Sequence, residues 1–365
     1  MNSRVNFRSM LPSVRHFHTK DLSRPLTYIG AAGFEDRAMA VLDSFIRENA
    51  KIEKAIAIEY KPHGDERNRV TEFKDRLEKV CESIVWTTYD RCNPQKFQDQ
   101  SFSLLSSIES SHVLIDISAL SKFLTMVLLQ SIRKTQCDVT IGYAEAEVYH
   151  PIQEEFEREK RKLGATPDFL TTGIYDILTV TSLSSVSMQG YPILLLVFPT
   201  FNHFEIVALY NEISPQFMVL FEGDPHEERD KWRLQAIREV NRNFIDNPDY
   251  VSDSKVLSTF DYISNVEALE EVYNTYCYSN KILLAPTGSK LQTIAAFVFK
   301  QLHPDIQVVY PVTRSFLGEY SEKVRALWSI HLGRFSNFIA SLNQYSRKIE
   351  SNHRLLVTGQ KSIGT

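Results

Sequence analysis

The sequence predicts an α/β protein made of two tandem Rossmann-like parallel-sheet domains followed by a C-terminal helix. The chain has 365 residues, which is too long for one ordinary core and suits two domains. Short apolar runs alternate with segments of helical spacing, which is typical of βαβ units. This alternation stops near residue 151 and restarts near residue 191, so one plan is used twice.

The first predicted domain covers residues 25–150. Its run at 113–117 is almost fully apolar, as expected where helices cover both faces of a parallel sheet. Strands are expected at 26–30, 54–60, 84–88, 113–117 and 138–143. Helices are expected to follow the first four strands, one carrying Ala38, Val41, Leu42 and Phe45, and the others over 66–82, 95–109 and 122–134.

A connector is predicted over 151–190, because a highly charged stretch is followed there by glycine, proline and a Ser/Thr-rich segment. The second predicted domain covers 191–315. Its strands are expected at 193–198, 217–222, 282–285 and 306–310, with helices after Glu205 and over 227–245 and 291–302.

The two ends of the chain look different from the middle. Residues 1–24 predict a flexible N-terminal arm, although their basic residues would also suit a mitochondrial-type leader. Over 316–350 apolar residues recur at intervals of three and four, which predicts an amphipathic helix. Between 320 and 349 that helix would cap the second domain or contact a second copy of the chain in a homodimer. Residues 351–365 predict a frayed polar tail.

The composition describes an ordinary protein surface rather than a nucleic-acid binder. The formal charge is −4 and charged residues make up 24% of the chain, whereas a dedicated nucleic-acid binder is usually basic. The four cysteines form no CxxC pair and have no histidines at zinc spacing, so a cytoplasmic location and no metal are expected. No apolar run approaches the roughly 20 residues needed to cross a bilayer, so no membrane partner is expected.

Small, hydroxyl and basic residues follow two predicted strands at equivalent places in the repeat. In an open parallel sheet, ligands bind beyond the carboxyl ends of the strands, and the backbone N–H groups of a helix N-terminus can face an anion. Ser118 and Thr287 would also serve as plain helix N-caps, and Gly288 as a turn residue. The candidate ligand contacts are Ser118, Ser121 and Lys122 in the first half and Thr287, Gly288, Ser289 and Lys290 in the second.

A second group of candidates lies at the start of each half. Gly33, Glu35 and Arg37 follow the first strand, and Glu205 is the expected counterpart of Glu35. Glu35 would face the ligand or would only complement the dipole of the first helical turn. Asp116 ends a buried strand, where a carboxylate would bind a ribose or cap the next loop.

Catalytic residues are only weakly indicated. His63, His226 and Asp116 are the candidates for acid–base chemistry, but no G-x-S-x-G, HExxH or close carboxylate pair accompanies them. The stretch 287–290 departs from the Walker A pattern, and 30–33 departs from the GxGxxG fingerprint, so neither ATP hydrolysis nor NAD chemistry is favoured and no cofactor is expected.

The loops 117–122 and 286–290 resemble those of the CARF superfamily, the Rossmann-like sensor domains of CRISPR-linked and other prokaryotic antiviral defence proteins. The loop at 287–289 is similar to that family's Thr-Gly-Gly loop, with Ser289 in place of a glycine, and 33–37 also resembles an element of defence-associated proteins. The resemblance covers roughly residues 26–311. It implies a nucleotide or cyclic-oligonucleotide ligand bound between two such domains. No effector domain is evident in the sequence, so a separate effector protein is an expected partner.

Three functions remain open from the sequence. The first is a nucleotide-binding sensor or regulatory subunit of a defence system, which uses the paired loops. The second is an enzyme that acts on a nucleotide or nucleic-acid phosphodiester. The third is an interaction subunit that recruits a partner through the 320–349 helix.

Overall fold

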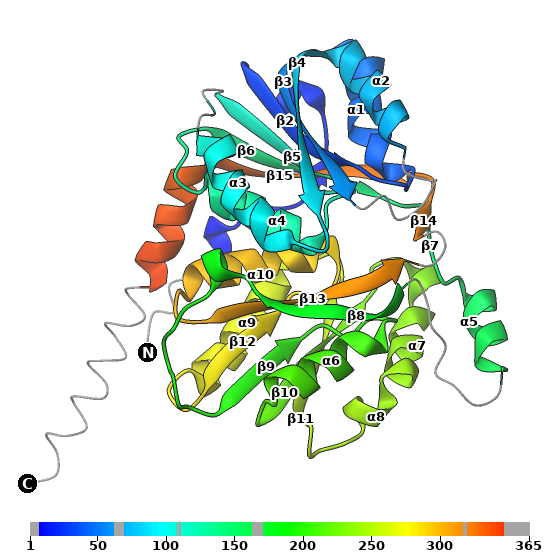
Figure 1. Ribbon diagram of the computed structural model, residues 1–365, viewed down its shortest axis with the longest axis vertical. Coiled ribbons are helices and arrows are strands. Elements are labelled where there is room, and N and C mark those ends of the chain that lie inside the picture. The colour runs from blue at the N-terminus through cyan, green and yellow to red at the C-terminus, as the bar shows by residue number, and fades with distance from the viewer. Residues whose placement is uncertain are drawn as a thin grey trace, which may run out of the picture.

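The computed structural model describes residues 7–61, 69–106, 108, 111–162, 171–316 and 320–346. Two α/β units are stacked with the helices α4 (Lys122–Ile132) and α10 (Lys290–Leu302) between their sheets (Figure 1). The predicted α/β class and its tandem Rossmann-like plan are confirmed. In the described part of the chain, no helix is long and apolar enough to span a membrane.

The sheet of the first unit has seven strands in the order β1-β15-β6-β5-β2-β3-β4. The five strands from β6 to β4 are parallel, while β15 runs antiparallel to β6 and β1 runs antiparallel to β15. The strands are β1 (Arg15–His16), β2 (Leu26–Ala32), β3 (Ile52–Lys61), β4 (Cys81–Asp90), β5 (His112–Asp116), β6 (Asp138–Glu145) and β15 (Ala326–Arg334). The other helices of this unit are α1 (Arg37–Arg47), α2 (Val70–Val80) and α3 (Pro94–Ser106), with 3-10 turns at Phe7–Met10 and Thr19–Asp21.

The sheet of the second unit has six strands in the order β11-β10-β9-β12-β13-β8. All are parallel except the edge strand β8, which runs antiparallel to β13. The strands are β8 (Thr171–Thr179), β9 (Ile193–Val197), β10 (Phe217–Asp224), β11 (Val251–Ser258), β12 (Lys281–Ala285) and β13 (Gln307–Phe316). The other helices are α5 (Gln153–Lys160), α6 (His203–Ile213), α7 (Trp232–Val240), α8 (Arg242–Ile245) and α9 (Tyr262–Tyr276), with 3-10 turns at Thr181–Leu183 and Glu228–Asp230.

The two sheets repeat one topology, as the sequence pattern predicts. If the parallel strands of each unit are numbered along the chain, both sheets have the order 3-2-1-4-5, and an antiparallel strand lies beyond the fifth. The order reverses between the first and fourth strands, where Ile29 pairs with Ile115 and Leu196 pairs with Leu284. Each sheet therefore has a switch point at the place where such folds bind ligands.

The two units share one hydrophobic core, so they form one body. Residues 291–302 of α10 are all buried, because one face packs on its own sheet and the other meets α4. Gln301 donates to the side chain of Gln130 at 3.2 Å across this contact. A continuous core cluster contains residues of both units, such as Ile115 and Leu196. Alone, each unit would expose the face of α4 or α10 that meets the other helix.

The C-terminal segment differs from the predicted helix over 316–350. Residues 326–334 form the strand β15 along β6, and the helix spans only 335–346 in the described part. Trp328, Ile330 and Leu332 lie on one face of β15, with the period of two that is typical of a strand. The apolar spacing of three and four over the longer segment predicted a helix instead. Phe335 and Leu342 of the helix are fully buried in the same chain, so its apolar face is already covered.

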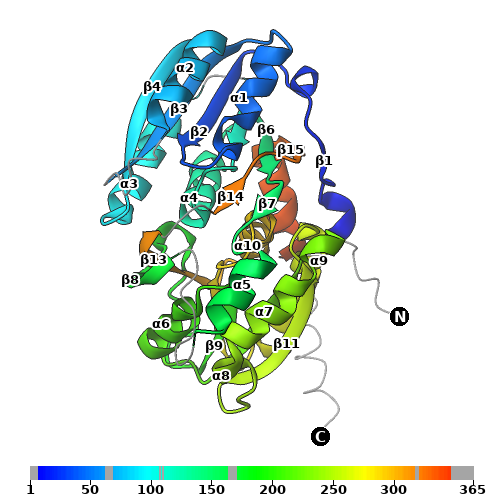
Figure 2. The same ribbon diagram turned by 90° about the vertical axis from the view of Figure 1, so that its right-hand side faces the viewer.

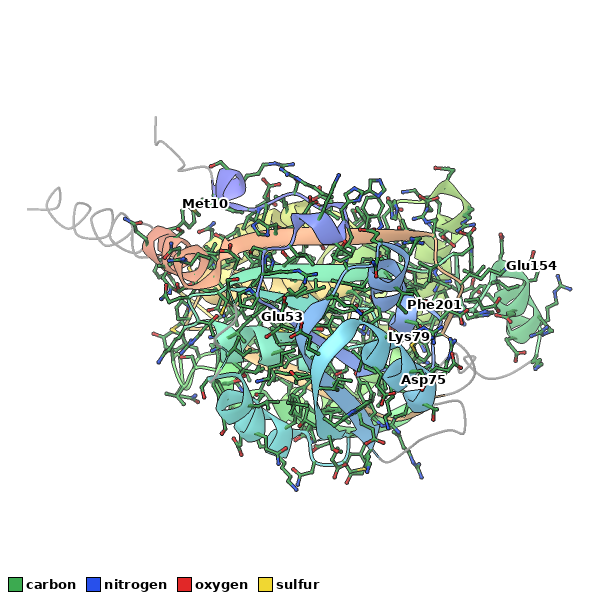
Figure 3. All side chains as sticks on the ribbon, turned by 90° about the horizontal axis from the view of Figure 1, so that it is seen from above. Met10, Glu53, Asp75, Lys79, Glu154 and Phe201 are labelled. Carbon is green, nitrogen blue, oxygen red and sulfur yellow. The ribbon has the colours of Figure 1, made fainter. Side chains whose placement is uncertain are left out.

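The predicted connector and arm also differ from the structure. β8, within the predicted connector 151–190, belongs to the second sheet, and the charged α5 projects from the body with Glu154 at its outer edge (Figure 3). Residues 7–24 of the predicted flexible arm lie along the molecule, and Arg8 forms an ion pair with Glu267 of α9 at 2.7 Å. The strand β11 and the helix α9 were not predicted at all.

A short antiparallel ribbon joins the two units where the chain crosses between them. It consists of β7 (Val148–Tyr149) and β14 (Ser321–Glu322), and Figure 2 shows it between the first and second units. The chain thus leaves the first unit through β7 and returns to it through β14.

Candidate functional site

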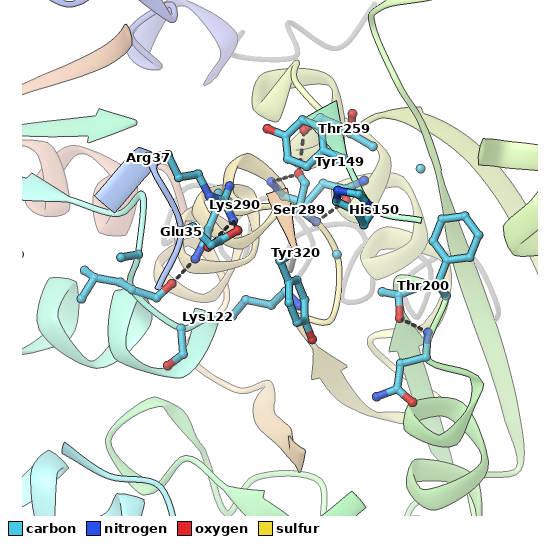
Figure 4. A pocket seen from close by; sticks show the side chains of 18 of the residues that line it. Glu35, Arg37, Lys122, Tyr149, His150, Thr200, Thr259, Ser289, Lys290 and Tyr320 are labelled. Carbon is cyan, nitrogen blue, oxygen red and sulfur yellow. Dashed lines mark hydrogen bonds and ion pairs between the residues drawn. The ribbon is translucent and has the colours of Figure 1, made fainter. Parts of the chain in front are cut away.

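A cavity of about 510 Å³ lies where the carboxyl ends of the two sheets meet. The loops that follow the first and fourth strands of both units contribute to its wall, so both switch points open into one space. Its size is in the usual range of small-molecule sites, about 300–1,000 Å³. The predicted ligand residues that line it are Gly33, Glu35, Arg37, Ser121, Lys122, Glu205, Gly288, Ser289 and Lys290 (Figure 4).

Two serine–lysine pairs occupy matching places in the two units. Ser121 caps α4 by accepting from the Leu124 N–H at 3.1 Å, and Ser289 caps α10 by accepting from the Gln292 N–H at 3.1 Å. The serines are therefore N-caps, and the lysine after each is the first residue of its helix. Both helix N-termini, which favour anions, lie at the cavity.

Both lysines are partly buried at the cavity and feel charges from the opposite unit. Burial, with Arg37 nearby, lowers the pKa of Lys290 to about 7, while Glu35 of the first unit acts in the other direction. The Lys290 ammonium donates a hydrogen bond to the Leu120 carbonyl, which also belongs to the first unit. Burial lowers the pKa of Lys122 as well, against the attraction of Glu205 in the second unit. Figure 4 shows Glu35, Arg37, Lys122 and Lys290 together in one part of the pocket.

Glu35 and Arg37 form an ion pair beyond the carboxyl end of β2. One guanidinium nitrogen of Arg37 lies 2.9 Å from both carboxylate oxygens of Glu35, and Ser321 of the ribbon donates to Glu35 at 2.6 Å. Although burial acts to lower it, Glu35 raises the pKa of Arg37 above its ordinary value. Glu35 lies before α1, which begins at Arg37, so it is not part of the first helical turn. Its carboxylate forms the ion pair with Arg37 instead.

Glu205 occupies the corresponding place in the second unit, within the first turn of α6. It is buried and accepts from the Thr200 hydroxyl at 2.8 Å. Burial raises its pKa, and Lys122 opposes the shift. Each unit thus contributes one acid and one lysine to the cavity. Each lysine is attracted by the acid of the other unit, Lys290 by Glu35 and Lys122 by Glu205.

Asp116, Ser118 and Thr287 lie behind the cavity wall and do not line it. Asp116 accepts from the Ser118 N–H at 3.0 Å and from the Tyr28 hydroxyl at 2.9 Å, and burial raises its pKa to about 6. Ser118 accepts from the Ala144 N–H at 2.8 Å. Thr287 donates to the Phe198 carbonyl at 2.7 Å. These side chains fix the loops, and Asp116 has the capping role rather than the ribose-binding one.

Of the two candidate histidines, His226 lines the cavity and His63 lies outside the described residues. His226 is 3.3 Å from Glu145 and 3.3 Å from Glu227, and an Arg325 nitrogen lies 2.9 Å from its ring. Asp116, the proposed catalytic carboxylate, is behind the wall. The arrangement therefore offers no histidine–aspartate pair at the cavity among the described residues.

In sequence, the chain matches no defined protein family and no curated protein. It is similar in structure to a type III CRISPR defence DNA nuclease activated by cyclic oligoadenylate, with a TM-score of 0.50 and 11% identity. The match covers 78% of this chain and 65% of that structure, so the chain spans less than two thirds of its length. The chain shares its α/β fold with this nuclease. At this identity the likeness shows nothing more than the fold.

A weaker likeness is to the cytoplasmic domain of a prokaryotic cation chloride cotransporter. Its TM-score is 0.23 at 10% identity, over 79% of this chain and 94% of that domain. A score this low supports no conclusion about this chain.

Aromatic side chains are the part of the cavity wall that sequence reasoning missed. A tyrosine stands on the fifth strand of each unit, Tyr143 on β6 and Tyr310 on β13, and both line the cavity. Tyr60 also belongs to the wall, where it donates to the Ala119 carbonyl at 2.9 Å and accepts from the Ser121 N–H at 2.7 Å. The available signal was that Tyr60, Tyr143 and Tyr310 are the last residues of the strands expected at 54–60, 138–143 and 306–310. They supply flat surfaces on which a base can stack.

The ribbon closes one side of the cavity. Arg37 lies over the ring of Tyr149 at 5.8 Å, and the Tyr149 hydroxyl is 2.9 Å from that of Tyr143. His150 follows in the chain and bonds to Glu155 at 2.9 Å and Glu322 at 2.8 Å. Although burial acts against it, these hydrogen bonds raise the pKa of His150 above its ordinary value.

Proposed function

We propose that the cavity binds an anionic nucleotide and that the protein is a nucleotide sensor or regulatory subunit of a prokaryotic defence system. The observation that carries the proposal is the pair of Ser–Lys loops, one from each unit, that bring two lysines and two helix N-termini to one cavity. Phosphates are the groups that such a pair of N-termini and ammonium groups favours.

The rest of the cavity suits the remainder of a nucleotide. Its wall contains the tyrosines of both fifth strands, which would stack on bases, and Glu35 and Glu205, which would accept hydrogen bonds from ribose hydroxyls. The defence assignment is supported by the structural neighbour, which is described as activated by cyclic oligoadenylate. Two similar half-sites would fit a ligand with two phosphates, such as a cyclic oligonucleotide, and a separate effector protein would receive the signal.

The test is thermal unfolding of the protein with mono-, di- and cyclic oligonucleotides. A ligand at 100 times its dissociation constant adds about 2.7 kcal/mol to the free energy of unfolding. Lys122→Met and Lys290→Met should each weaken the stabilisation at least tenfold in ligand concentration, while Lys134→Met, an exposed lysine beyond α4, should leave it unchanged. Stabilisation that survives both cavity substitutions would refute the proposal.

The alternative function, an enzyme, is tested by asking whether the protein breaks down the nucleotide that it binds. His226 is the catalytic candidate that remains at the cavity. Breakdown of a bound nucleotide that is lost in His226→Ala would favour an enzyme over a sensor. Binding without breakdown would favour the sensor.

A further inference from the structure

The first sheet ends in β4, a long strand with an open outer edge. β4 pairs with β3 from Cys81 to Asp90 in one continuous register, and in the described part of the chain no strand lies on its other side. Figure 2 shows β4 along the outer margin of the first unit. The unpaired N–H and C=O groups of such an edge are a template for another strand.

β4 lacks the features by which proteins usually keep an edge strand from pairing. Those features are a short strand, charged residues in its middle, proline, or a β-bulge. β4 has ten residues without proline or lysine, and its charged residues, Glu82 and Asp90, lie near its two ends. The middle of the strand is Ile84-Val85-Trp86, in which Val85 is 36% and Trp86 is 37% exposed. An apolar edge of this length and exposure is a predicted pairing site.

The other outer edges of the two large sheets carry these protective features. β1 has only two residues. The register of β8 shifts against β13, and that of β11 shifts against β10, as at a β-bulge. β11 also carries Asp253 and Lys255 in its middle. β11 is the counterpart of β4, because both are the third strand of their unit, so the repeat has one protected edge and one open edge.

We propose that β4 joins two copies of this chain into a dimer, in which the two β4 strands pair antiparallel about a two-fold axis at Val85. The two first-unit sheets then become one continuous sheet. Each Ile84 lies opposite the partner's Trp86, and an aromatic residue opposite a β-branched one is a favourable cross-strand pair. Each Glu82 lies opposite the partner's Thr88, so no like charges meet.

The positions of the two acids select this register. Because successive side chains point to opposite faces, residues that lie opposite each other across the axis differ in number by an even amount. Moving the axis one residue to Trp86 would place Glu82 opposite the partner's Asp90, and like charges directly opposite each other are destabilising. Moving it to Ile84 would separate Ile84 from the partner's Trp86. The strand is therefore complementary to itself in one register, which favours a second copy over an unrelated strand.

The experiment is sedimentation velocity of the whole protein at low and high micromolar concentrations, where the wild type should sediment as a dimer. Val85→Lys and Val85→Glu each place like charges at the axis and should weaken the dimer by about a hundredfold or more. An equal mixture of the two variants should dimerise again, because lysine then lies opposite glutamate. Val256→Lys makes the same change at an exposed valine of β11 and should leave the dimer unchanged.

A second pair of variants tests the register without a change at the axis. Thr88→Lys places a lysine opposite the partner's Glu82 and should tighten the dimer several-fold, whereas Thr88→Glu should weaken it. Val85 and Thr88 are exposed, so each variant should fold, which circular dichroism checks.

Three results overturn the inference. The first is a dimer that is unaffected by both Val85→Lys and Thr88→Glu. The second is a mixture of the two Val85 variants that stays monomeric. The third is a wild type that is monomeric at every concentration, which would leave the edge of β4 to a strand of another protein.

Discussion

Lys290 provides the most direct test of the electrostatics of the cavity. Burial lowers its pKa from 10.5 to about 7. At neutral pH, keeping a charged amine at this site therefore lowers the free energy of unfolding. Lys290→Met keeps the length of the side chain and removes the charge. We therefore expect the ligand-free variant to be more stable than the wild type at neutral pH.

The size of the effect follows from the shift. At about 1.4 kcal/mol per pKa unit, a change from 10.5 to about 7 sets an upper limit of about 5 kcal/mol. The side chain is only partly buried and keeps contact with the cavity, so solvent reduces this, and we expect about 1–2 kcal/mol.

The sign of the pH dependence is fixed by the direction of the shift. Between pH 7 and 10.5 the unfolded chain binds a proton at Lys290 that the folded chain does not, so the stability of the wild type rises with pH in this window. The advantage of Lys290→Met should be greatest below pH 7 and should shrink toward pH 9–10.

The assay is urea unfolding, followed by circular dichroism, at pH 6, 7.5 and 9 for the wild type, Lys290→Met and the exposed control Lys134→Met. The control removes the same charge outside the cavity. A variant that is less stable at every pH, or an advantage that does not change with pH, would refute the placement of a desolvated lysine at the cavity. A bound anion should reverse the order of stability, because it stabilises the charged amine.

Three further predictions concern the frame of the site. Ser118→Ala leaves the buried Ala144 N–H without its acceptor, so the free energy of unfolding should fall by about 1–3 kcal/mol in urea titrations, with nucleotide affinity changed less than threefold. Gly33→Ala places a Cβ 2.8 Å from that of Ala119, and calorimetry should show a loss of about 1–3 kcal/mol; an unchanged melting temperature would contradict the close packing of the two loops. His150 has a raised pKa, so its contribution to stability is present below pH 6.5 and is lost as the pH rises through its folded-state value. The stability gap between wild type and His150→Gln should therefore be larger at pH 5.5 than at pH 8.5, and equal gaps would argue against the two carboxylate partners.

The sequence by itself determined the alternation of strands and helices, the repeat, and the loops that carry Lys122 and Lys290. These features are local: apolar periodicity reports which face of an element is buried, and residues after a strand lie at its carboxyl end. The same local reasoning named Ser118 and Thr287 as N-cap candidates, whereas the helices are capped by Ser121 and Ser289, three and two residues further along the chain.

Only the tertiary structure decided how these parts combine. β15 completes the first sheet from the far end of the chain, because the edge of β6 needs hydrogen-bond partners that no local pattern specifies. The packing of α4 on α10 turns both switch points toward one cavity and brings Tyr143 and Tyr310 into its wall. It also leaves Asp116 behind the wall. Such outcomes depend on contacts between residues far apart in the sequence, and spacing along the chain carries no record of them.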